Sequence, residues 1–91
     1  MTDLASIVLA YHLSGFEHRT SEARARVIDE ALRAVVVSWG SGRCYHAWRY
    51  SVAMDGTPWM LDFSRQHWTR AGAEDEVVGR WERARARARA R

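Results

Sequence analysis

The sequence contains no lysine and no asparagine, and it has one cysteine and one proline among its 91 residues. A single cysteine, Cys44, excludes an internal disulfide and is typical of a reducing compartment, so we expect a cytoplasmic protein. No run of about 18 apolar residues is present, so no membrane-spanning helix is predicted. The first residues also lack the basic segment that opens a signal peptide.

Motifs that would indicate an enzyme are missing as well. The sequence has no glycine-rich phosphate loop after a predicted strand and no nucleophile-elbow motif. The carboxylates are dispersed, and cap, turn, loop or cross-strand roles account for them, which leaves no pair for acid–base catalysis. We therefore predict a protein that is not an enzyme and holds no cofactor.

Apolar residues are plentiful, at 47% of the chain, and five of them are tryptophans. A chain of this length buries roughly 60–65% of its unfolded surface, which is enough for one small core. Residues 80–91 contain six arginines and one glutamate, a net charge of +5, so the first 79 residues carry −2 of the total +3. We expect a single domain over residues 1–82 and a low-complexity Arg-Ala tail over residues 83–91 that frays or projects.

Three helices are predicted. Apolar residues recur at helical spacing over residues 3–14 and, from Ala23 onward, over residues 21–39. The three valines at 35–37 would also suit the start of a strand, because β-branched residues prefer sheets, but the unbroken spacing favours a helix. Residues 74–91 have acidic side chains in the first turn and arginines in the last turns, as the helix dipole favours.

Residues 44–67 are predicted to form a β-hairpin. Asp55-Gly56 is a signal for a two-residue type I′ turn, which gives strands at about 44–54 and 57–67. Because side chains alternate along a strand, this turn places the large apolar residues on one buried face. The register pairs Val52 with Trp59, Trp48 with Phe63, Arg49 with Asp62 and Cys44 with His67. A lone hairpin is marginal in water, so it must pack on the helices. The predicted fold is α+β with the order α-α-β-β-α.

A protein partner is the leading functional prediction. Trp68 lies just past the hairpin between arginines, and its alternatives are burial in the core or a role as an interface anchor. The other hairpin face carries a mixed polar and aromatic patch, which suits a protein partner or a second copy of the chain. The candidate partner-binding residues are Trp68, Arg65, Arg70, Tyr45, Arg49 and Met60. We predict a non-catalytic regulator or inhibitor of a larger assembly, of the small kind carried by phages and mobile elements.

Two other functions have candidate residues. The tail arginines, Arg83, Arg85, Arg87, Arg89 and Arg91, can neutralise phosphates and so indicate a nucleic-acid-binding protein. An alternating CG repeat in DNA would also encode this tail without any function. Cys44, His46 and His67 are predicted to converge at the open end of the hairpin, where they suit zinc binding or a thiol enzyme. This grouping is weak because it lacks metal-ligand spacing and a fourth ligand.

Overall fold

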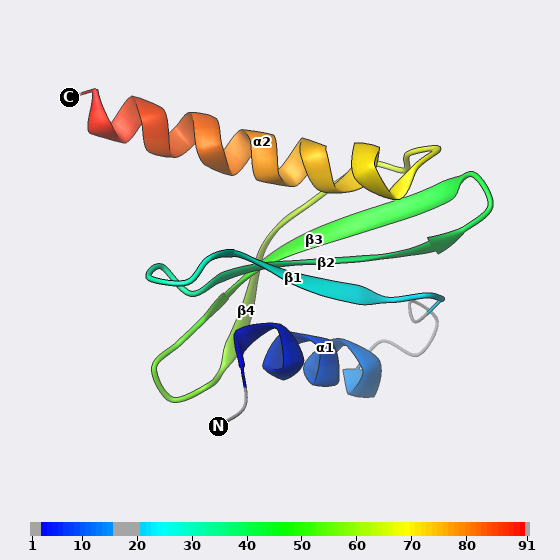
Figure 1. The fold of residues 1–91 in the computed structure, drawn as a ribbon, viewed down its shortest axis with the longest axis horizontal. Helices are drawn as coiled ribbons and strands as arrows, with labels where there is room; N and C mark the ends of the chain where they lie inside the picture. The colour runs from blue at the N-terminus through cyan, green and yellow to red at the C-terminus, as the bar shows by residue number, and fades with distance from the viewer. Residues whose placement is uncertain (1–2, 16–20, 91) are drawn as a thin grey trace.

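The computed structural model describes residues 3–15 and 21–90. The elements in chain order are α1 (Leu4–Gly15), β1 (Arg24–Asp29), β2 (Ala34–Ser41), β3 (Cys44–Val52), β4 (Pro58–Phe63) and α2 (Arg70–Arg89). Within these residues the strands form one antiparallel sheet in the order β1-β2-β3-β4. The two helices lie on opposite sides of the sheet (Figure 1). The protein is therefore α+β, but the element order is α-β-β-β-β-α.

The predicted helix over residues 21–39 is wrong, because this segment forms β1, a turn and β2. The carboxylate of Asp29 accepts a hydrogen bond of 2.9 Å from the Leu32 backbone N–H, and Arg33 has a positive φ of 56°. Both features reverse the chain where the helix was expected to continue. β2 is buried along almost its whole length. A strand that is covered on both faces reads as a continuous apolar run, so its alternation is hidden.

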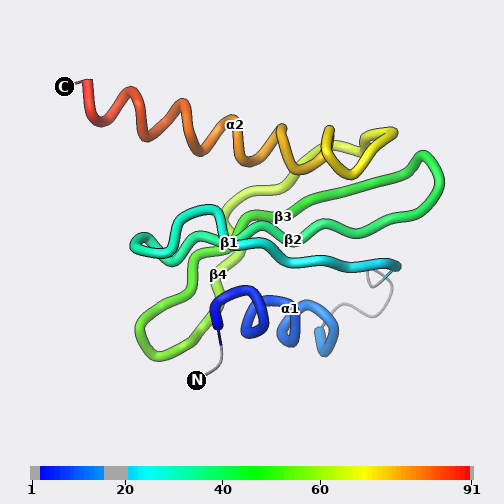
Figure 2. Tube along the Cα trace, viewed as in Figure 1, coloured from blue at the N-terminus to red at the C-terminus, as the bar shows by residue number. Residues whose placement is uncertain are grey.

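Each face of the sheet has its own small core. The core under α1 contains Leu4, Val8, Val35, Val37, Trp39, Tyr50 and Val52. The core under α2 contains Val36, Ala47, Ala73, Val77 and Val78. Successive valines of β2 thus point to opposite helices, as strand geometry requires. Figure 2 shows the sheet running between the two helices.

The β3–β4 hairpin is confirmed, with a partly correct register. Trp48 pairs with Phe63 and Arg49 with Asp62 as predicted, but the register then shifts, and Tyr50 pairs with Met60. The Gly56 N–H donates to the Ala53 carbonyl over 2.9 Å, and Gly56 has a positive φ of 89°. The loop is therefore a turn closed by a left-handed glycine rather than a two-residue reversal.

Helix α2 begins earlier than predicted and runs through Arg89. Thr69 caps it by accepting a hydrogen bond of 3.0 Å from the Gly72 N–H, so residues 70–73 already belong to the helix. Its buried residues, Ala73, Val77 and Val78, all lie in its first half. The second half is mostly exposed, and the high helix propensity of alanine and arginine favours it locally. Fraying of residues 83–91 stays a prediction. No helix in the described part of the chain has the length and hydrophobicity to span a membrane.

Candidate protein-binding surface

The most unusual surface follows the outer edge of the sheet, which we call the β4 edge and define as residues 58–68. β4 is the last strand of the sheet. After Phe63 the chain keeps following β3, because the Ser64 N–H donates to the Ala47 carbonyl over 2.8 Å and His67 forms an antiparallel bridge with Tyr45. The whole segment therefore lies along one edge.

Large apolar side chains are exposed along this edge. The exposed fractions are 61% for Trp59, 45% for Met60, 54% for Leu61, 61% for Phe63 and 71% for Trp68. Single exposed apolar residues are ordinary, but several on one short segment mark an interaction surface. The prediction that Trp59 and Phe63 are core residues is wrong. Their strand is at the margin of the sheet, where α1 and α2 do not cover them.

Side chains form hydrogen bonds with part of the backbone along the β4 edge. The Phe63 N–H donates to Asp62 Oδ1 over 2.9 Å, and the Phe63 carbonyl accepts from Arg80 over 2.7 Å. The Arg65 N–H donates to Glu76 Oε1 over 3.1 Å. At the other end, Pro58 has no N–H to donate. The edge is therefore poorly suited to adding another strand, and its apolar side chains are the groups that a partner can contact.

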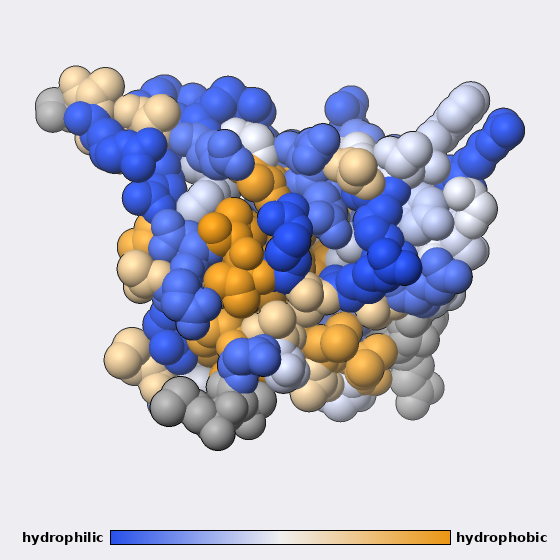
Figure 3. All heavy atoms as spheres, in the orientation of Figure 1, coloured by the Kyte–Doolittle hydropathy of each residue, from blue (hydrophilic) through white to orange (hydrophobic). Residues whose placement is uncertain are grey.

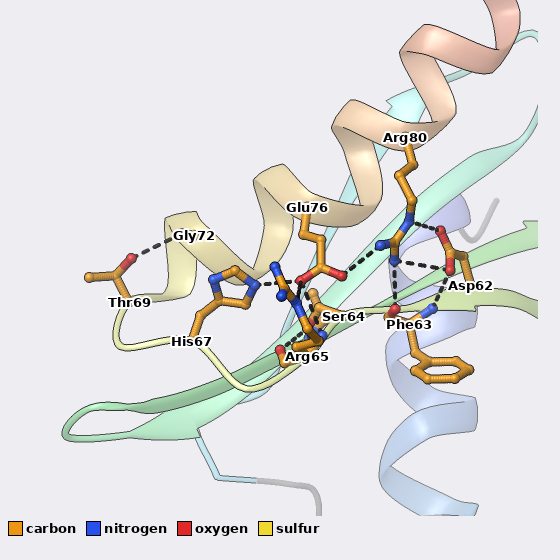
Figure 4. A network of polar contacts seen from close by, with 10 residues as sticks. Asp62, Phe63, Ser64, Arg65, His67, Thr69, Gly72, Glu76 and Arg80 are labelled. Atoms are coloured by element: carbon orange, nitrogen blue, oxygen red, sulfur yellow. Dashed lines mark hydrogen bonds and ion pairs between the residues drawn. The ribbon is translucent and has the colours of Figure 1, made fainter.

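A polar network fastens this edge to α2 (Figure 4). Arg80 bridges two carboxylates, with Nε 2.9 Å from Asp62 Oδ2 and Nη1 2.6 Å from Glu76 Oε2. His67 Nε2 lies 2.6 Å from Glu76 Oε1. Burial raises the pKa of Glu76, but hydrogen bonds from His67, Arg80 and Arg65 outweigh it and lower this pKa to about 2. The Glu76 carboxylate is thus held ionised and links the segment after β4 to α2.

The predicted partner-binding residues fall into two groups. Trp68, Met60 and Arg65 are exposed, and Trp68 lies 5.4 Å from the guanidinium of Arg43. Arg70 is instead engaged inside the fold, where it donates to both oxygens of Ser38.

Tyr45 and Arg49 belong with the engaged residues. The Tyr45 ring lies 5.3 Å beneath the guanidinium of Arg70. Burial lowers the pKa of Arg49, and the neighbouring Asp62 works against that change. These two side chains are partly covered by the fold, so the exposed residues Trp68, Met60 and Arg65 supply most of the contact area that a partner could use. The role of each residue in partner binding stays a prediction.

The structure separates the candidate metal ligands. The predicted pairing of Cys44 with His67 is wrong, because Tyr45 lies opposite His67. Cys44 Sγ is 4.0 Å from His46 Nε2, and His46 stacks on Trp39 in the α1 layer. His67 contacts Glu76 of α2 instead. An offset of one residue moves a side chain to the other face of a sheet. The described residues contain no group of three or more possible metal ligands.

The second half of α2 borders a groove that the sequence did not predict. The α2–β4 groove has a volume of about 650 Å³, and its lining includes Arg49, Leu61, Trp81, Arg83 and Arg87. Arg89 lines a different hollow, beside β1. Residues two apart on a helix lie on opposite sides, whereas residues four apart share a side. The Arg-Ala repeat therefore forms two arginine rows, while Arg91 lies outside the described residues.

On the face drawn in Figure 3, hydrophilic and hydrophobic side chains gather in separate areas. In Figure 3 hydrophilic side chains follow α2, and hydrophobic atoms gather between the two helices. Arg85 fixes the basic half of α2 over the sheet, because its Nη1 donates to Asp29 Oδ2 over 3.0 Å. The guanidinium of Arg85 also lies 5.0 Å above the Trp81 ring.

Sequence reasoning missed the contacts that position this surface. Glu76 and Arg80 are four residues apart, a spacing that would have suggested their ion pair. The links from Arg80 to Asp62 and from Arg85 to Asp29 join distant segments and have no local signal. No protein-family model, curated protein or solved structure matches the chain.

Proposed function

We propose that this chain is a non-catalytic protein-binding module that contacts its partner through the exposed side chains of the β4 edge. The observation that carries the proposal is the exposure of Trp59, Met60, Leu61 and Phe63 on one six-residue strand. Fully burying a side chain of this size contributes about 1.5–3 kcal/mol, and these side chains are about half exposed, so each can contribute about half of that on binding. Several together can offset the entropic cost of association, which is at least about 4 kcal/mol.

The rigidity of the edge supports the same proposal. Arg80 and Glu76 connect β4 and the segment after it to α2, so the apolar side chains project from an ordered backbone. A surface that is ordered before binding loses less entropy on association. We propose a small cytoplasmic regulator or inhibitor of a larger assembly, of the kind carried by phages and mobile elements. The single exposed cysteine suits a reducing compartment.

Affinity capture tests the proposal. The tagged chain is incubated with nuclease-treated lysate of its native host, alongside the double variant Met60→Ser/Phe63→Ser and the control Met54→Ser. Met54 is 86% exposed at the hairpin tip, outside the β4 edge. We expect the control to retain the captured protein and the double variant to lose it. Equal capture by all three forms would contradict the proposal.

The same double variant also tests whether the partner is a second copy of this chain. Sedimentation of the purified chain measures its mass in the absence of other proteins. If the wild type sediments as a dimer and the Met60→Ser/Phe63→Ser variant as a monomer, the partner is a second copy.

Nucleic-acid binding is the second candidate, because Arg83, Arg87 and Arg89 are exposed on one helix end. Phosphate contacts would make the affinity fall steeply with salt. A chain ending at Trp81 would then lose binding, whereas the protein-binding proposal expects the β4 edge to keep its partner. Loss of the captured material on nuclease treatment would favour this second candidate.

A further inference from the structure

We propose that the α2–β4 groove binds an acidic peptide segment, which would belong to the protein partner and so rests on the function proposed above. The groove lies next to the β4 edge, since Leu61 lines the groove and is also exposed on β4. A partner seated on this edge can therefore extend a segment between β4 and α2.

The charge of the groove favours an anionic occupant. Arg83 and Arg87 are one helical turn apart and line the groove together. Within the described part of the chain, neither forms an ion pair. Asp62 is the acidic residue in the lining, and Arg80 neutralises it with two hydrogen bonds of 2.9 and 3.1 Å. The unneutralised charge of the groove is thus positive.

Arg49 adds a second reason to expect an oxygen ligand. Its Nε atom is buried and has no hydrogen-bond partner among the described residues. Arg49 also lines the groove, on the side opposite α2. A buried donor without a partner is costly, and a carboxylate that draws the Arg49 guanidinium into the groove would give it a charge-assisted hydrogen bond.

The apolar part of the lining favours a peptide over a nucleic acid. Leu61, Ala84 and Ala88 offer aliphatic contacts between the arginines, which match apolar side chains that alternate with carboxylates. Single-stranded nucleic acids are held by aromatic rings on which bases stack. The Trp81 ring is already covered on one face by the Arg85 guanidinium, 5.0 Å away. Arg87 lines this groove and Arg89 the hollow beside β1, so the last tail arginines do not form one continuous track.

The test selects ligands from a random library of twelve-residue peptides displayed on phage, with the folded full chain as the target. The affinities of the enriched peptides are then measured by fluorescence anisotropy for the wild type, Arg87→Gln and Arg89→Gln. These two variants remove the same charge from the same repeat, but only Arg87 lines the α2–β4 groove. Glutamine cannot replace the charge-assisted hydrogen bonds that arginine forms with a carboxylate. We therefore expect Arg87→Gln to weaken binding at least fivefold and Arg89→Gln to change it less than twofold.

Enriched peptides that carry aspartate or glutamate and show this difference support the groove. Equal weakening by the two variants would overturn it, because the tail would then act as a diffuse charge. Peptides without acidic residues, or no enrichment at all, would also overturn it. So would competition by a twelve-nucleotide thymidine oligomer at equal or lower concentration. Peptides whose binding is weakened by Phe63→Ser but not by Arg87→Gln would overturn only the proposal that the groove binds them. The capture experiment tests the role of the β4 edge separately.

Discussion

Replacing Glu76 with glutamine is expected to destabilise the fold by about 1.5–2 kcal/mol at neutral pH. Glu76 connects α2 to the β4 edge through Arg80, His67 and the Arg65 N–H. Glutamine has nearly the same size but no charge, so the substitution removes the ionic component without opening a cavity. Its effect on stability therefore measures the polar network rather than packing.

The magnitude follows from the pKa of Glu76. The hydrogen bonds lower this pKa from 4.5 to about 2, which corresponds to about 3.4 kcal/mol at 1.36 kcal/mol per pKa unit. The Glu76 side chain is 12% exposed, but that of its partner Arg80 is 41% exposed. Solvent screening weakens ion pairs at such positions, so about half of the full figure is expected.

The sign of the pH dependence is fixed by the same values. Because folding lowers the pKa of Glu76, its contribution is fully present above the unfolded value of 4.5 and is lost as the pH falls through about 2. The difference in unfolding free energy between the wild type and Glu76→Gln should therefore shrink between about pH 5 and pH 2.

Urea unfolding followed by tryptophan fluorescence measures this difference at pH 7, 5, 4 and 3. Glu82→Gln is the matched control, because Glu82 lies on the same helix and its side chain is exposed. Two results would refute the reasoning: equal destabilisation by the two variants, or a Glu76→Gln difference that stays constant with pH.

Two further predictions concern stability. Gly40→Ala should lower the unfolding free energy measured in urea by more than about 3 kcal/mol, because Gly40 has a φ of +145° and an added Cβ would lie 2.1 Å from the Cys44 carbonyl oxygen. The control Gly42→Ala, whose Cβ meets only open space, should lower it by about 1 kcal/mol. Equal losses of stability would contradict the close approach at Gly40. Trp68→Ala should change the unfolding free energy by less than about 1 kcal/mol, because Trp68 is 71% exposed. A loss of several kcal/mol would instead place its ring in a packed environment.

The β3–β4 hairpin could be predicted from the sequence because its signals are local. The predicted pairs of Trp48 with Phe63 and Arg49 with Asp62 occur, because the irregularity between Arg49 and Tyr50 cancels the one-residue error at the loop. The loop length was predicted wrongly because a glycine with positive φ suits both the two-residue type I′ turn and the longer loop that Gly56 closes. The resulting one-residue offset changed the pairing of the strand positions nearest the hairpin tip.

The β1–β2 hairpin could not be predicted, because its periodicity suits two structures. Spacing of apolar residues from Ala23 to Trp39 matches a helix, while burial of both faces hides the alternation of a strand. The charges were misleading in the same way. Arg26 is four residues from Glu22 and from Glu30, as in a helical pair, yet it pairs across the fold with Glu74 at 2.9 Å. Only the packing of α2 on the sheet distinguishes these arrangements.

The β4 edge combines two features that are usually in conflict. Exposed apolar edge strands invite indiscriminate pairing, and proteins commonly protect them with charge, proline or a covering element. Here Pro58, the Arg80 contact with the Phe63 carbonyl and the Glu76 contact with the Arg65 N–H protect the backbone, while the apolar side chains stay uncovered. A partner must therefore fit the shape of those side chains rather than simply extend the sheet. That separation is what a specific protein-binding surface requires, and it is why we propose this function for the β4 edge.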